Sequence, residues 1–152
     1  MVSFFLVAGI VIPFAYTQLD FKNRSFAINF QEFINQNHLH PSITEKWKNH
    51  QIGVDQEQNK LLYYRNGHYP LQTIIDLNQV KNISLHEHSH LKKMGRSKLE
   101  VVDYVGVKIQ FTDSKLPAKM LEIYDEKLAS ALTAERSIAN KWLQILQSRI
   151  HN

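Results

Sequence analysis

Three histidines are spaced so that they can share a metal ion. His86, His88 and His90 occupy alternate positions, and alternate residues of a β-strand project from one face, roughly 7 Å apart. Imidazoles at that spacing can bind Zn(II), Ni(II) or Cu(II), and His68 or Glu100 would add a ligand from a neighbouring strand. One hypothesis for this segment is therefore a metal site.

The apolar residues of the same segment favour a different interpretation. Ile83, Leu85 and Leu91 have the opposite parity and are expected to be buried, which places the histidines in solvent. No surrounding shell would then fix the imidazole tautomers or exclude water. We therefore expect an exposed polar face beside a loop, and we predict no bound metal or other cofactor.

A cluster of cations follows the histidines. Lys92, Lys93, Arg96 and Lys98 surround Gly95, and a basic loop of this kind can lie on anionic lipid headgroups. Nucleic acid is a competing partner because the pI is about 9.3, but no binding motif accompanies the cluster, so we predict no nucleic-acid binding. Runs of charge are usually only surface, and a solvated loop without a partner is the simplest interpretation.

No motif for catalysis is found. The sequence has no glycine-rich phosphate loop, no nucleophile elbow and no His-Glu-x-x-His motif. It also has no cysteine, which excludes disulfides, thiolate zinc sites and a thiol nucleophile. We predict that the protein is not an enzyme. The alternatives are a small enzyme or ligand-binding protein with a pocket between sheet and helix, and a metal-binding protein that uses the histidines.

The beginning of the 152-residue chain differs from the rest, because its first charged residue is Asp20. As a helix, residues 2–19 would rise about 27 Å, close to the hydrocarbon thickness of a bilayer. We predict a membrane anchor at residues 1–19; a signal peptide and a buried segment are the alternatives. Lys22 and Arg24 follow it, so the positive-inside rule predicts a cytoplasmic C-terminal domain.

Residues 20–49 are predicted to be a polar connector. Phe26, Phe30, Phe33 and Ile34 have the spacing of one helical face, which predicts a short helix. After it, a brief turn capped by Ser42 or Thr44 is expected to carry Trp47.

From Gln51 the hydrophobic period becomes two, which predicts a series of antiparallel strands. The clearest strand covers residues 99–112, whose odd positions are apolar except for Asp103. We expect this strand to bury one face and to bend or bulge between Asp103 and Gly106.

The end of the chain has helical periodicity. Beginning near Thr133, an amphipathic helix is predicted with Ile138, Trp142 and Ile145 on its apolar stripe. With no second long helix to cover that stripe, the helix must pack on the sheet, with Trp142 buried.

Three segments together resemble the bacterial pleckstrin-homology-like domains. Residues 52–63 are similar to their first hairpin, and residues 120–125 followed by 139–142 are similar to their ending. The resemblance implies a mainly β fold over residues 50–152: a bent antiparallel sheet or partial barrel capped by one C-terminal helix. It also implies a membrane-tethered binding or scaffold module with a protein or peptide partner. The acidic turn at residues 55–59 departs from the basic cluster of phosphoinositide-binding members.

Overall fold

The computed structural model describes residues 29–67, 70–127 and 132–150. It divides the chain into a unit that ends at Leu39 and a second unit, His40–Asn152. The predicted anchor, residues 1–19, lies outside the described residues. Within the described ranges, no helix combines the length and apolar character needed to cross a bilayer.

The described part of the first unit contains one short helix, α2 (Phe30–Gln36). Asn29 caps it by accepting a hydrogen bond of 2.9 Å from the Glu32 backbone N–H, as short polar residues do at a helix N-terminus. Phe33 and Ile34 are its buried residues. This helix lies where the spacing of phenylalanines predicted one; Phe26 is outside the described residues.

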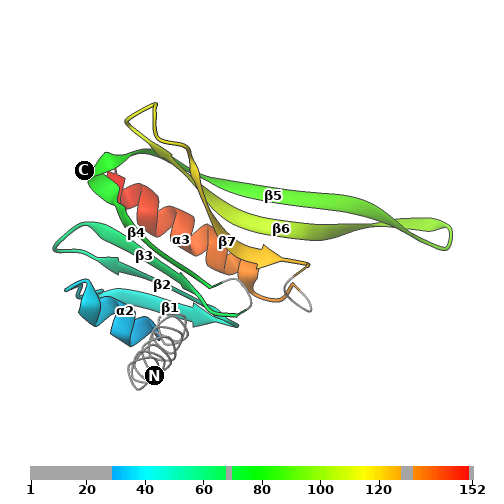
Figure 1. Cartoon of the computed structure of the whole chain (residues 1–152). Helices are drawn as coiled ribbons and strands as arrows, with labels where there is room; N and C mark the ends of the chain where they lie inside the picture. Colours follow the sequence, from blue (N-terminus) through cyan, green and yellow to red (C-terminus); the bar gives the residue numbers. More distant parts are fainter. Residues whose placement is uncertain (1–28, 68–69, 128–131, 151–152) are drawn as a thin grey trace, which may run out of the picture. The chain divides into compact units, whose positions relative to one another are not determined.

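The second unit is mainly β, with two antiparallel sheets and a C-terminal helix (Figure 1). The first sheet has the order β1 (Ile43–Trp47), β2 (His50–Asp55), β3 (Lys60–Arg65) and β4 (Leu71–Asp76). A single 3-10 turn, η1 (Leu77–Gln79), leads to the second sheet. That sheet has the order β5 (Val80–Met94), β6 (Ser97–Phe111) and β7 (Lys119–Asp125), and α3 (Glu135–Ile150) follows.

Strand β1 corrects the prediction of a turn around Trp47. Ile43 pairs with Val54 and Trp47 with His50, so residues 43–47 are the edge strand of the first sheet. The Trp47 indole N–H donates a 2.9 Å hydrogen bond to the Ile123 carbonyl in β7, which links this edge strand to the second sheet. The second unit accordingly begins at His40 rather than at residue 50.

Helix α3 closes the core between the two sheets. Ala139, Trp142 and Leu146 are fully buried, and Ile138 and Ile145 pack against the same core while remaining partly exposed. The Trp142 indole N–H donates a 2.6 Å hydrogen bond to a Glu45 carboxylate oxygen in β1. The helix is thus hydrogen-bonded to the first sheet and packed on the second.

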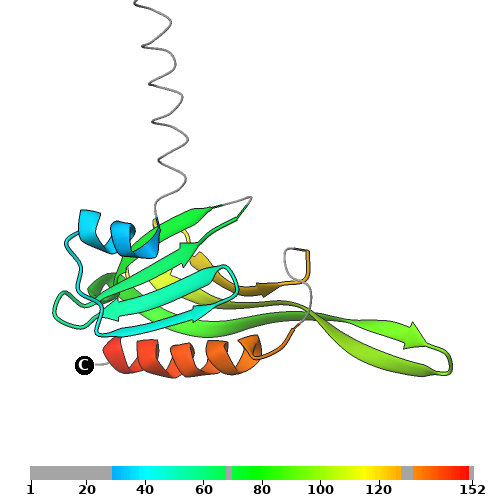
Figure 2. The same ribbon diagram turned by 90° about the horizontal axis from the view of Figure 1, so that it is seen from below.

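Strands β5 and β6 extend beyond the third strand of their sheet. Pairing between β6 and β7 covers Tyr104 to Ile109, whereas β5 and β6 pair out to Met94 and Ser97. Residues 89–102 therefore form a two-stranded hairpin, which we call the arm. Figures 1 and 2 show it extending past the other strands of the second unit.

A β-bulge marks the root of the arm. His88 pairs with Tyr104 and Ser89 with Val102, which leaves Asp103 without a partner, inside the interval where a bulge was predicted. Beyond the bulge the side chains of β6 change faces. Because directly paired residues point to one face, the pairing of Leu99 with Lys92 places Leu99 on the same face as the histidines.

Two expectations about burial are therefore wrong. Leu91 is 65% exposed and Leu99 is 53% exposed, although both were expected to face the core. Leu91 does keep the parity of Ile83, but it lies in the two-stranded arm, beyond the part of β6 that pairs with β7. Leu99 has lost the parity of Val105 and Val107 because the bulge adds one residue to β6.

Candidate functional site

The four predicted cations lie at the tip of the arm, residues 91–99. Lys92 and Lys93 are the last cations of β5 and Lys98 lies at the start of β6, so the expected basic loop is largely strand. Only Gly95 and Arg96 form the turn. Gly95 has a φ of 65°, which suits the first central position of a type II′ hairpin turn. The hairpin geometry holds the cations at the far end of the arm.

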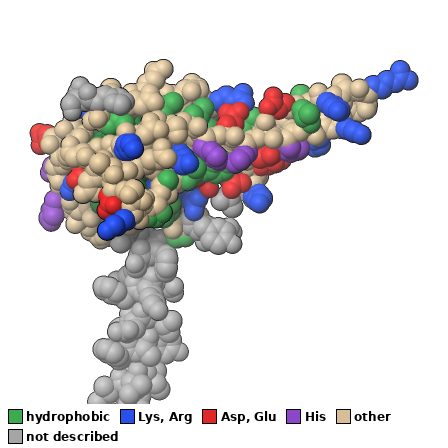
Figure 3. Space-filling model, turned by 90° about the horizontal axis from the view of Figure 1, so that it is seen from above, with side chains coloured by type: hydrophobic (Ala, Val, Ile, Leu, Met, Phe, Trp, Pro, Cys, Tyr) green, Lys and Arg blue, Asp and Glu red, His purple; other side chains and the backbone are tan. Residues whose placement is uncertain are grey.

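Large apolar side chains are exposed among these cations. Leu91, Met94 and Leu99 are 65%, 57% and 53% exposed. Figure 3 shows Lys and Arg side chains gathered at the end of the arm. Leu99 lies on the face of its partner Lys92, and Leu91, which pairs with Glu100, lies on the opposite face. Apolar side chains are therefore exposed on both faces of the tip, and exposed apolar surface is typical of interaction sites.

The cross-strand pairs of the tip are not arranged for stability in water. Lys93 pairs directly with Lys98, and like charges in that position destabilise a sheet. Lys92 pairs with Leu99, so that an ammonium group and an exposed leucine share one face. Residues 91–99 contain no Asp or Glu that would neutralise the tip. An anionic surface would relieve this repulsion.

The predicted histidine row is divided at the root of the arm. His86 and His88 have their Nε2 atoms 2.9 Å apart, and both rings lie near the Tyr104 ring. Burial, together with the charges of Glu122 and Asp125, raises the pKa of Tyr104 to about 12. The ring of Tyr104 crosses Gly106, where a Cβ would come within 2.7 Å of it.

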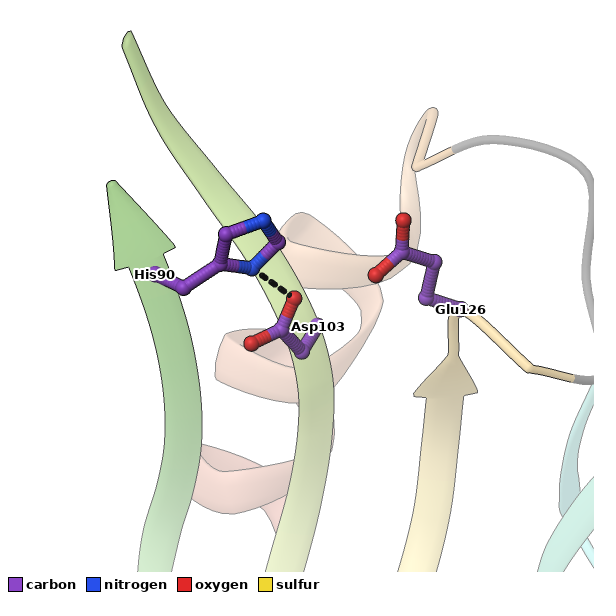
Figure 4. Close-up of side chains that lie close together, drawn as sticks. All are labelled: His90, Asp103 and Glu126. Carbon is purple, nitrogen blue, oxygen red and sulfur yellow. Dashed lines mark hydrogen bonds and ion pairs between the residues drawn. The ribbon is translucent and has the colours of Figure 1, made fainter. Parts of the chain in front are cut away.

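His90 has a different partner. Its Nδ1 atom lies 2.5 Å from Oδ1 of Asp103, the bulged residue. Glu126, directly after β7, donates its backbone N–H to the Asp103 carbonyl at 2.8 Å, and the ligand atoms of His90, Asp103 and Glu126 all lie within 4.8 Å of one another. Figure 4 shows the three side chains side by side.

The two other residues proposed for the metal hypothesis do not join this cluster. Glu100 pairs with Leu91, which places it on the face opposite to His90, and it accepts a 2.6 Å hydrogen bond from Ser89. His68 is outside the described residues. The sequence indicated Asp103 only as a break in an apolar series, and it gave no signal that Glu126 would lie beside it.

A second polar cluster lies between the sheets and was not found from the sequence. The Glu122 carboxylate in β7 contacts His50 Nε2 at 3.1 Å and Arg65 Nη1 at 2.8 Å. Burial alone would raise the pKa of Glu122, but the hydrogen bond with His50 and the charge of Arg65 outweigh it, and the pKa lies below its usual value. The His50 ring also stacks on Trp47. This cluster joins β2 and β3 to β7.

One hollow of the second unit has no described lining residue from α3. A hollow of about 500 Å³ is lined by Asn78, Gln79, Thr112, Asp113 and Leu116, where the chain enters the β6–β7 connection. Asp113 accepts the Lys115 backbone N–H, as an Asp in a turn commonly does. No histidine is among the described lining residues.

Comparisons of the chain with protein-family models, curated proteins and solved structures find no significant match.

Proposed function

We propose that the protein is a membrane-tethered, non-catalytic binding module of pleckstrin-homology-like fold whose arm contacts the anionic surface of a lipid bilayer. The observation that carries the proposal is the tip of the arm. Four cations and three exposed apolar side chains lie there within nine residues, without an acidic residue.

The fold supports the first half of the proposal. A four-stranded and a three-stranded antiparallel sheet are followed by one helix that covers the core between them, and this supports the coarser part of the implied fold, a mainly β domain with a C-terminal helix. Such domains serve binding and scaffolding roles, and a fold alone does not distinguish among ligands. The choice of ligand therefore rests on the arm.

The size of the electrostatic effect indicates why a tether is needed. Each cation near an anionic bilayer contributes on the order of 1 kcal/mol, so four contribute about 4 kcal/mol before salt screening. That corresponds to a dissociation constant of about 1 mM, too weak to hold a free protein on a membrane. An anchor at residues 1–19 would supply the missing effective concentration.

The composition of the arm favours lipid over nucleic acid. Proteins that bind single strands stack bases on aromatic side chains, and residues 89–102 contain no Phe, Tyr or Trp. Exposed Leu and Met side chains next to Lys and Arg instead suit the boundary between headgroups and acyl chains. A protein partner at the same tip is the competing outcome of the test.

The test reconstitutes the full chain into nanodiscs of phosphatidylcholine alone or with added phosphatidylserine and follows the hydrogen–deuterium exchange of residues 91–99. We expect slower exchange of these amides in the phosphatidylserine nanodiscs only, and loss of this protection at high salt. Replacement of Lys92, Lys93, Arg96 and Lys98 by Ser should abolish it.

A matched control removes four exposed cations elsewhere in the second unit: Lys46, Lys81, Lys115 and Lys119. Both variants change the formal charge from +4 to 0, so only the position of the cations differs. Equal loss of protection in both variants, or equal protection in neutral nanodiscs, would overturn the lipid contact. Absence of protection combined with tip-dependent crosslinking to a protein would replace lipid by a protein partner.

A further inference from the structure

We propose that His90, Asp103 and Glu126 form a binding site for a divalent cation, of the Zn(II) or Mn(II) class, at the root of the arm. This inference is independent of the lipid contact, because it concerns different residues. It also differs from the histidine row expected from the sequence, since only His90 is common to both.

The backbone brings the three side chains together. His90 is on β5, Asp103 is the bulged residue of β6, and Glu126 directly follows β7. The bulge turns Asp103 toward the face that carries His90, as bulges commonly re-aim a side chain. The Glu126 backbone N–H on the Asp103 carbonyl fixes the third residue beside the other two.

The donor set suits a borderline divalent cation. One imidazole nitrogen and two carboxylates are ligands that Zn(II) and Mn(II) both accept. Metal–donor distances near 2.1 Å place donor atoms about 3 to 3.5 Å from one another. The observed separations, with all ligand atoms within 4.8 Å, approach this arrangement, and water would complete the coordination because His90 and Glu126 are exposed.

The charge balance of the cluster also favours a cation. Asp103 and Glu126 are like charges in close proximity, and His90 is the single hydrogen-bonding partner of the Asp103 carboxylate among the described residues. Glu126 contributes its backbone N–H to a hydrogen bond, whereas its exposed carboxylate takes part in none of the hydrogen bonds or ion pairs found among the described residues. A divalent cation would neutralise both carboxylates.

Metal binding would have a structural consequence. The cluster lies where the three-stranded sheet becomes the two-stranded arm, and an isolated hairpin is marginally stable in water. A cation held by residues from β5, β6 and the end of β7 would fasten the base of the arm to the rest of the sheet. Because the site forms only in the folded protein, binding would also raise the melting temperature.

The experiment titrates ZnCl₂ or MnCl₂ into purified full-length protein that carries no polyhistidine tag, followed by calorimetry and by the imidazole NMR signals. We expect one saturable site that perturbs His90. Glu126→Gln and Asp103→Asn should each weaken metal binding at least about tenfold. Loss of a residue that only orients a metal ligand already lowers the affinity about tenfold or more, and loss of a ligand itself should cost at least as much.

Two controls make the outcome decisive. Glu57→Gln removes an exposed carboxylate elsewhere and should leave the affinity unchanged, as should His88→Asn. Glu126→Gln makes no new demand on folding, because its carboxylate has no described partner. Unchanged affinity in Glu126→Gln, loss of binding in His88→Asn, or absence of saturable binding by the folded protein would each overturn the proposed site.

Discussion

At the scale of single residues, Trp142 joins the helix to both sheets. Its ring is completely buried and its indole N–H is bonded to Glu45, so truncation creates a cavity and leaves Lys141 as the remaining partner of that carboxylate. Trp142→Ala is expected to lower the free energy of unfolding by about 3 to 5 kcal/mol, measured by denaturant unfolding. Leu116→Ala, at a side chain that is 45% exposed, is the control. Equal midpoints for the parent and the Trp142 variant would contradict the packing described.

Glu122 makes the stability of the protein depend on pH. Its pKa in the folded state lies below the ordinary value of 4.5, so the ionised carboxylate stabilises the fold above that pH, and this contribution is lost as the pH falls through the folded pKa. Glu122→Gln should be less stable than the parent near pH 7, and the difference should shrink in acid. Urea unfolding of both proteins, from pH 7 down to acidic pH, measures this difference in the free energy of unfolding. A difference independent of pH would show that the ion pairs with His50 and Arg65 are not its source.

At the scale of elements, the arm is expected to be separable from the core. Residues 91–100 are all exposed, and His90 pairs with Val101, so an Asn-Gly turn replacing residues 91–100 can close the shortened hairpin. We expect the free energy of unfolding, measured by thermal denaturation, to change by no more than about 0.5 kcal/mol, as is usual for substitutions on the surface. Loss of cooperative unfolding would mean that the arm has a structural role in the second unit.

The elements also differ in how far the sequence determined them. The β2–β3 hairpin, the bulge near Asp103 and α3 were predictable, because alternation, a polar break and helical spacing are local signals. Strand β1 was missed because its evidence is distant: the Trp47 indole is bonded to a residue 76 positions away. The exposure of Leu91 was missed because parity indicates a face but not where the covering layer ends.

In the candidate site, too, contacts between residues distant in the sequence could not be predicted. The cations of the tip are contiguous in sequence and were identified as a group. Glu126 lies 23 positions after Asp103 and joins it only through the pairing of β6 with β7. No periodicity in one sequence reports such a contact, and the same holds for Glu122 with His50.

At the scale of the whole molecule, the proposed function combines a weak contact with a tether. In that proposal the arm alone would bind an anionic surface usefully only at high local concentration, which a predicted anchor at residues 1–19 would provide. The central claim is therefore that the tip of the arm enters the headgroup region of an anionic bilayer when the full chain resides in that bilayer.

The most direct measurement uses the absence of cysteine, which allows one environment-sensitive dye to be attached at Met94→Cys. In full-length protein reconstituted into nanodiscs, the account predicts blue-shifted emission, quenched by spin-labelled lipid, when phosphatidylserine is present. Neither effect should occur with phosphatidylcholine alone, with the label at Leu116→Cys, or with the label at position 94 after the four tip cations are replaced by Ser. Identical emission at positions 94 and 116 in anionic nanodiscs, or an equal shift in neutral lipid, would contradict the account.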